Sequence, residues 1–245
     1  MSLKLNDHYK NVKESYLFSD IAKRVAAYTE KHPEAKIIRL GIGDVTLPLT
    51  PTVISAMEKA VAEMGKKETF RGYAPEYGYD FIRQAVADYY KKFGVTLSLN
   101  EVFVSDGAKS DVGNIVDIFG DNTVLIPDPV YPVYLDSNLM SGRRVSFLKA
   151  SSEDGFLPMP SGLKEDSYLI YLCSPNNPTG AVYNREQLTA WVNFALKTGS
   201  VIIFDSAYEA YIKGDYPHSV YEIPGAEKCA VEICSLSKTA GFTGT

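Results

Sequence analysis

The stretch SYLIYLCSPNNPTGAVYNREQLTAWVNFALKTGSVIIFD (167–205) contains a strand, a helix and a second strand. Residues 167–175 and 200–205 are short runs that are nearly continuous in apolar side chains, as strands buried on both faces are. Residues 184–199 between them are expected to form a helix that ends on a glycine. Such strands, separated by helices, predict a parallel sheet that is covered on both faces.

The same alternation extends through the rest of the chain. Helices are expected over 18–32, 50–65 and 79–94, the second with Thr50 as its N-cap, Pro51 in its first turn and Gly65 as its stop. The other expected elements are strands over 37–44, 101–105, 123–128, 143–150 and 229–235 and helices within 106–120 and 130–142. The expected fold class is therefore α/β, a three-layer α/β/α arrangement with a mostly parallel sheet.

The composition limits the class of protein. The 245 residues are 45% hydrophobic, which supports a large core, and the formal charge of −5 lacks the Lys/Arg excess of a nucleic-acid-binding protein. Cys173, Cys229 and Cys234 have no metal-ligand spacing, so we expect reduced thiols and no metal site. The first residues, MSLKLNDHYK, contain no apolar h-region, and no run approaches the ~20 apolar residues of a membrane span. We expect a cytoplasmic protein without membrane or nucleic-acid partners.

Ligands of parallel sheets bind beyond the carboxyl ends of the strands, so the turns at those ends are the candidate sites. In DGAKSD (106–111) the glycine lets the backbone approach a ligand, and the helix start that follows favours an anion such as phosphate. The alternative is a plain turn with Ser110 or Asp111 as N-cap. In SPNNPTG (174–180) two successive amides suit a ligand oxygen, although a purely structural turn uses the same residue types.

Two further strand ends carry reactive groups. Asp205 ends an apolar strand and Tyr208 follows three residues later, so Asp205 is either a helix N-cap or a carboxylate aimed at a cationic group. Lys238 lies in SLSKTAGFTGT (235–245), where small hydroxyl-bearing residues and glycines form a cup that suits phosphate. A lysine at a strand end is usually solvated, but in a desolvated cleft its pKa falls and its amine can form a Schiff base.

These groups together match the needs of one cofactor. Pyridoxal phosphate (PLP) requires an amine for its aldehyde, a carboxylate for its pyridinium nitrogen, donors for its ring oxygen and a cup for its phosphate. The four turns supply all of them, and the set is far more specific than any of its members.

The order SPNNPTG, FDSAY and SLSKTAGFTG resembles the fold-type I PLP-dependent aminotransferases. Longer stretches, among them TFRGYAPEYGYDFIRQAV, VSDGAKSDVGNI, IPDPVYPVYLD and DSAYEAYI, are similar to the LL-diaminopimelate aminotransferases within that family. The resemblance extends from about Tyr16 to the last residue.

The resemblance implies roles for individual residues. Lys238 would bind the cofactor aldehyde and shuttle the substrate proton, Asp205 would pair with the pyridinium nitrogen, and Asn177 and Tyr208 would hydrogen-bond the ring oxygen. Tyr131 matches the aromatic residue that stacks on the ring, although on its own it equally suits a core tyrosine at a helix start. The implied phosphate contacts are Ala108, Lys109, Ser235, Ser237 and, from the neighbouring subunit of a homodimer, Tyr73.

Substrate contacts are implied in the same way. Glu76 matches an acidic residue that contacts the distal amino group of diaminopimelate, and Tyr16 matches a tyrosine of the N-terminal arm; on their own they suit a solvated carboxylate and a helix-entry contact. The other implied substrate contacts are Gly43, Lys109, Tyr131 and Asn177. Leu47 and Tyr77 depart from the arginine and glutamine expected in this family.

The resemblance also implies an organisation and a reaction. Residues 1–47 would be the N-terminal arm and the start of a small domain, and 48–245 an incomplete large domain, with a phosphate-binding arginine and the C-terminal small domain lacking. The reaction expected is amino-group transfer between glutamate and tetrahydrodipicolinate, giving LL-diaminopimelate and 2-oxoglutarate for lysine synthesis. The rival hypotheses are a broader aspartate or aromatic aminotransferase, a β-lyase of the same fold, and a non-catalytic remnant that binds the cofactor.

Overall fold

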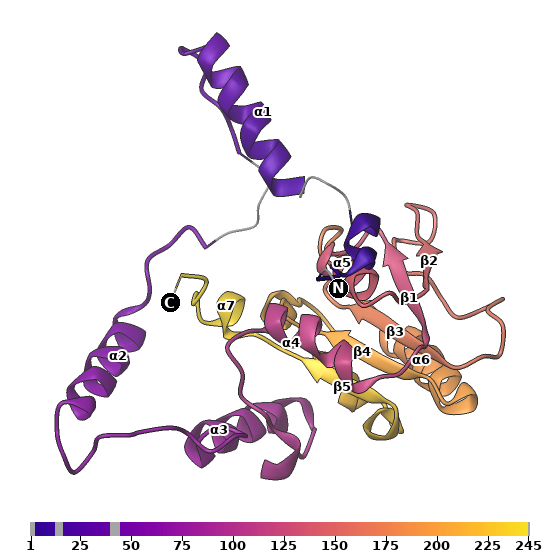
Figure 1. Cartoon of the computed structure of the whole chain (residues 1–245). Coiled ribbons are helices and arrows are strands. Elements are labelled where there is room, and N and C mark those ends of the chain that lie inside the picture. The colour runs from indigo at the N-terminus through magenta and orange to yellow at the C-terminus, as the bar shows by residue number, and fades with distance from the viewer. Residues whose placement is uncertain (1–2, 13–16, 40–44, 245) are drawn as a thin grey trace.

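A computed structural model describes residues 3–12, 17–39 and 45–244. Its centre is a five-stranded sheet in the order β2-β1-β3-β4-β5, and every neighbouring pair is parallel (Figure 1). The strands are β1 (Thr123–Asp128), β2 (Val145–Lys149), β3 (Tyr168–Cys173), β4 (Val201–Asp205) and β5 (Ala230–Ile233). The predicted parallel sheet is confirmed.

Helices cover both faces of the sheet. Helices α4 (Ala108–Asn114) and α5 (Val133–Met140) pack on one face, and α6 (Arg185–Thr198) packs on the other. The short α7 (Leu236–Thr239) follows β5. The predicted three-layer α/β/α arrangement is confirmed.

Strand β3 shows why both faces need helices. Its alternate side chains Leu169 and Tyr171 join the core under α4 and α5, while Ile170 and Leu172 join the core under α6. A strand with apolar side chains on both faces is stable only between two covering layers. The apolar run therefore directly specifies the layered architecture.

Helix α6 begins and ends where its sequence indicates. The Asn184 side chain accepts a hydrogen bond from the Gln187 N–H at 2.9 Å, and the Gln187 side chain bonds back, which forms a capping box. Gly199 ends the helix with φ 67°, a left-handed conformation that glycine adopts without strain. Inside, the fully buried Trp191 donates its ring N–H to the Pro158 carbonyl at 3.0 Å.

The N-terminal helices also match their predicted positions. They are α1 (Leu17–Lys31), α2 (Pro51–Met64) and α3 (Asp80–Tyr90). No side chain of α2 is buried, and apolar side chains such as Ile54, Met57 and Val61 are exposed along it. Short 3-10 helices span Asp7–Asn11, Lys91–Phe93, Leu99–Glu101, Ile115–Ile118, Glu209–Tyr211, Val220–Glu222 and Ala226–Lys228. No helix in the described ranges is long and apolar enough to cross a membrane.

The predicted strand over 101–105 is wrong. The segment is apolar, but its only backbone bond to a distant segment among the described residues is from the Val104 N–H to the Tyr77 carbonyl, at 3.0 Å. The buried Arg83 side chain donates a hydrogen bond to the Val102 carbonyl at 3.1 Å. A side chain therefore pairs with a backbone group that a neighbouring strand would otherwise bind. Of the strand predicted over 37–44, residues 37–39 are not in a strand, and 40–44 lie outside the described residues.

Candidate functional site

The ends of β3, β4 and β5 lie level with one another at the carboxyl edge of the sheet. Cys173, Asp205 and Ile233 are register partners across the three strands. The Ser174 N–H donates to the Asp205 carbonyl at 3.0 Å, and the Ser206 N–H donates to the Ile233 carbonyl at 2.9 Å. The turns that follow these strands therefore start side by side, as the parallel sheet predicted.

Asp205 is a buried carboxylate at this edge, with 7% of its surface exposed. Its Oδ2 accepts a hydrogen bond from the Tyr134 hydroxyl, and its Oδ1 accepts one from the Ala207 N–H at 3.0 Å. Burial raises the pKa of Asp205, and these two hydrogen bonds oppose that rise. No α-helix starts at Asp205, so its side chain closes a tight turn and does not cap a helix.

Tyr134 is a site residue that sequence reasoning missed. It is fully buried on α5, stacked on Tyr171 with ring centroids 5.0 Å apart, and it meets Tyr131 edge to face at 5.9 Å. The available signal was its spacing, since it lies three residues after Tyr131 and therefore on the same side of a helix. A single sequence could not show that its hydroxyl reaches Asp205, 71 residues away.

Lys238 and Tyr208 lie together beyond β4 and β5. The Lys238 Nζ is 5.8 Å from the centroid of the Tyr208 ring, and both side chains are half-buried. Helix α7, which carries Lys238, contacts the 3-10 helix Glu209–Tyr211 that follows Tyr208. Burial is the main cause that raises the pKa of the Tyr208 phenol. Lys238 is therefore partly shielded from solvent, beside the Tyr208 ring.

The candidate phosphate contacts lie at two helix starts. Gly107 is the N-cap of α4, which has no side-chain cap, and a Cβ built on Gly107 would meet no atom within 4 Å. Ala108 and Lys109 follow it, and α4 contacts β5. The predicted alternative caps are wrong, since Gly107 holds that position and Asp111 accepts from the Ser105 hydroxyl at 2.6 Å.

The second helix start is that of α7. The Ser235 Oγ accepts from the Ser237 N–H at 3.1 Å and so caps the helix. A serine hydroxyl that accepts one bond can still donate its own proton to an anion. The Ser235 hydroxyl can therefore cap α7 and contact a phosphate at the same time.

The two amides of SPNNPTG have different environments. Asn176 is buried, and its Nδ2 donates to the Pro129 carbonyl at 3.2 Å and to the Thr179 hydroxyl at 2.9 Å. Asn177 is half-exposed, and its side chain makes no hydrogen bond to the other described residues. Asn176 is therefore the structural amide of the turn, and Asn177 retains its hydrogen-bonding capacity for a ligand.

The remaining predicted contacts do not join this cluster within the chain. The connection between α2 and α3 is long (Figure 1). Tyr73 and Glu76 are exposed on it, and Tyr73 has its whole side chain in solvent. Leu47 and Tyr77 are also exposed. The predicted substrate contacts Tyr16 and Gly43 lie outside the described residues.

Known proteins resemble this chain in sequence and in fold. The family model for aminotransferase class I and II matches residues 35–245. An LL-diaminopimelate aminotransferase of Lachnospira eligens is 53% identical, with 98% of this chain and 63% of the relative covered. One of Desulfosudis oleivorans is 51% identical, with 99% and 62% covered. The solved L,L-diaminopimelate aminotransferase from Chlamydomonas reinhardtii has a TM-score of 0.90 at 42% identity, over 100% of this chain and 63% of that one. The chain thus spans less than two thirds of the length of these relatives.

Proposed function

The chain belongs to the aminotransferase class I and II family, and from this we propose that its site serves PLP-dependent amino-group transfer between glutamate and tetrahydrodipicolinate. The products would be LL-2,6-diaminopimelate and 2-oxoglutarate. The observation that carries the proposal is the meeting of Asp205, Tyr208 and Lys238 at one sheet edge, in a chain 53% identical to an LL-diaminopimelate aminotransferase.

The residues at this edge fit PLP. The buried Asp205 carboxylate suits a protonated ring nitrogen, because a cation compensates a charge removed from water. The half-buried Lys238 amine suits an aldehyde, and the Tyr208 phenol and Asn177 amide suit a ring oxygen. When bound, PLP supplies an aldehyde that links to amines and a cationic ring that withdraws electrons from the substrate carbon.

The chain's own residues then have separate tasks. Tyr134 and the Ala207 N–H orient Asp205, so that its carboxylate keeps one direction, and their hydrogen bonds favour its ionised form against the effect of burial. Lys238 would supply the amine for the aldehyde and would act as the base that moves the proton of the substrate Cα to the cofactor carbon. The hydroxyl-bearing residues around Ser235 and the start of α4 hold the phosphate.

Tyr134→Phe is expected to weaken PLP binding about fivefold. The substitution keeps the stack on Tyr171 but removes one hydrogen bond, worth ~1 kcal/mol, from the carboxylate that faces the ring nitrogen. The pKa of Asp205 should rise further, because this hydrogen bond lowers it. A fluorescence titration of the variant with PLP measures the change, and an affinity equal to that of the unmodified protein would show that Tyr134 does not act through Asp205.

Glu76 is proposed to select the substrate by contacting its distal amino group across a dimer interface. Glu76→Gln should lower kcat/KM for LL-diaminopimelate about tenfold, the loss of one charge-assisted hydrogen bond, with little change for glutamate. Glu68→Gln is the matched control, since Glu68 is exposed on the same connection. Equal kinetics for LL-diaminopimelate in the two variants would favour the broader aspartate or aromatic specificity.

The proposal as a whole is tested by the visible absorption of the purified protein with PLP. We expect a band of covalently bound cofactor that changes on addition of LL-diaminopimelate and not of lysine or an aromatic amino acid. A band that responds equally to aromatic amino acids would indicate the broader enzyme. A band that responds to no amino acid would indicate a protein that binds the cofactor without catalysis.

The homodimer and the division into an arm (1–47) and a large domain (48–245) are also proposals. The full exposure of Tyr73 supports the dimer, because a tyrosine expected to bind the neighbouring subunit's cofactor must project away from its own chain. Light scattering of the purified protein measures the mass directly.

A further inference from the structure

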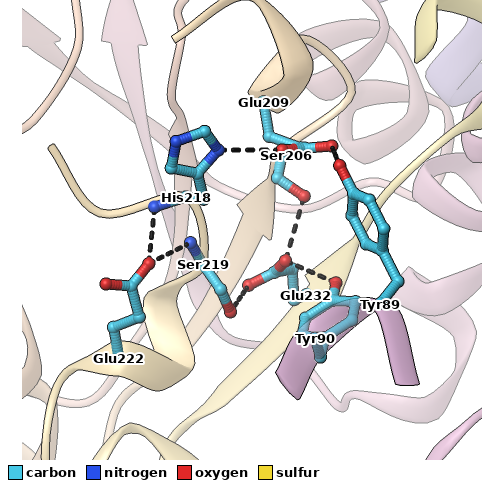
Figure 2. A network of polar contacts seen from close by, with 8 residues as sticks. All are labelled: Tyr89, Tyr90, Ser206, Glu209, His218, Ser219, Glu222 and Glu232. Atoms are coloured by element: carbon cyan, nitrogen blue, oxygen red, sulfur yellow. Dashed lines mark hydrogen bonds and ion pairs between the residues drawn. The ribbon is translucent and has the colours of Figure 1, made fainter. Parts of the chain in front are cut away.

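A second carboxylate, that of the half-buried Glu232, lies on β5 among donors from three segments of the chain. Glu232 Oε1 accepts from the Tyr90 hydroxyl at 2.6 Å and the Ser206 hydroxyl at 3.1 Å, and Oε2 accepts from the Ser219 hydroxyl at 2.7 Å (Figure 2). Oε2 also accepts from the Val220 N–H at 2.9 Å. Burial raises the pKa of Glu232, and the hydrogen bonds oppose the rise. All four donors hold the ionised form in one place.

Glu209 extends this network to the neighbouring tyrosine. Its Oε1 accepts from the Tyr89 hydroxyl at 2.6 Å, and its Oε2 lies 3.0 Å from His218 Nδ1 (Figure 2). The His218 ring stacks on Phe93 with centroids 4.7 Å apart, and the His218 backbone N–H donates to the Glu222 carboxylate at 2.6 Å. The end of α3 and the 3-10 turn after it are thereby tied to the segment between β4 and β5.

Residues 205–209, at the end of β4 and just after it, contact both the candidate cofactor site and this network. Asp205 and Tyr208 belong to the candidate cofactor site, whereas Ser206 bonds to Glu232 and Glu209 bonds to Tyr89. The backbone is continuous between them, with the Glu209 N–H donating to the Ser206 carbonyl at 2.9 Å. A shift of the network would therefore displace the site residues as well.

The composition of the network favours a geometric role. In the described part of the chain neither Glu209 nor Glu232 forms an ion pair with lysine or arginine. Holding a carboxylate away from water without a lysine or arginine partner is costly, and an apolar cluster of similar volume would stabilise the fold at least as well. Hydrogen bonds are directional, so they fix the positions of the side chains that they join. A binding site needs such fixed positions in the residues that support it.

We propose that Glu232 and Glu209 are positioning residues that hold segment 205–208 in its cofactor-binding geometry. Their own position depends on the hydroxyls of Tyr89 and Tyr90, so docking of α3 controls cofactor affinity. This inference rests on the proposed function, because it requires that Asp205 and Tyr208 bind PLP. Since α3 directly follows the connection that bears Glu76, the network also links the proposed substrate contact to the cofactor site.

The test compares two tyrosine-to-phenylalanine variants. Tyr90→Phe removes a hydroxyl from the network and keeps the ring. Tyr183→Phe is the matched control, because the buried Tyr183 hydroxyl donates to the Pro158 carbonyl at 3.1 Å in the core on the α6 face. We expect Tyr90→Phe to weaken PLP binding about fivefold, and Tyr183→Phe to lower the Tm without changing PLP affinity.

Hydrogen exchange of the cofactor-free variants gives a readout that needs no PLP. The amides of 206–209 should exchange faster in Tyr90→Phe than in Tyr183→Phe, because they lose the support of Glu232. Equal exchange, or equal PLP affinity, in the two variants overturns the positioning role. If the unmodified protein binds no PLP, the proposed function fails instead, and the inference fails with it for that separate reason.

Discussion

Replacing Lys238 by alanine is expected to abolish covalent attachment of PLP and to lower turnover by at least about a thousandfold. The side chain is half-buried beside Tyr208, where it would supply the amine that binds the aldehyde and the base that moves the substrate proton. General acid–base catalysis alone contributes about 10² to 10⁴-fold, and the covalent link is lost in addition. Borohydride reduction followed by mass spectrometry measures the attachment, and a coupled glutamate assay measures turnover.

Lys213→Ala is the matched control for Lys238→Ala. Lys213 is an exposed lysine on the connection between β4 and β5, so its loss should change neither attachment nor turnover. A Lys238→Ala variant that retains PLP after reduction, on a peptide containing another lysine, would assign the covalent role elsewhere. Retention of full turnover would end the assignment as a PLP-dependent aminotransferase.

The layered fold could be predicted because its information is local. A helix with a capping residue and a terminal glycine lies between the apolar runs of β3 and β4. With this helix between them, the two runs are best explained as buried parallel strands. The position of Asp205 followed from the same pattern, because the last residue of a buried parallel strand must lie at the carboxyl edge. These predictions used only residues within one strand–helix–strand unit.

The contacts that support the site could not be predicted in this way. Tyr134 and Asp205 are 71 residues apart, and Tyr90 and Glu232 are 142 apart, so only the folded chain brings each pair together. In the sequence Glu232 interrupts an apolar strand and has the appearance of a solvent-facing residue. The strand predicted over 101–105 is wrong for the same reason. Arg83, which lies on α3, donates a hydrogen bond to the Val102 carbonyl, and the sequence does not show this contact.

Replacing Asp205 by asparagine is expected to have opposite effects on cofactor binding and on stability. PLP affinity should fall about thirtyfold, since a charge-assisted hydrogen bond of ~2 kcal/mol to the ring nitrogen is lost. The cofactor-free protein should become more stable at neutral pH, because the variant no longer buries a group whose ionised form is penalised by burial. Asparagine can still accept from the Ala207 N–H and donate to the Tyr134 hydroxyl, so both partners stay satisfied.

The pH dependence separates this effect from a general change in packing. Burial raises the pKa of Asp205 above its ordinary 3.8, so the folded state binds the proton more tightly than the unfolded state. That stabilisation is complete below pH 3.8 and is lost as the pH rises through the folded pKa. The Tm difference between Asp205→Asn and the unmodified cofactor-free protein should therefore grow as the pH rises from 3.8 and level off above the folded pKa of Asp205. Asp215→Asn, a change at an exposed site of the same connection, should show no such trend. A pH-independent difference would show that burial of the charge is not the cause, and unchanged PLP affinity would remove Asp205 from the cofactor site.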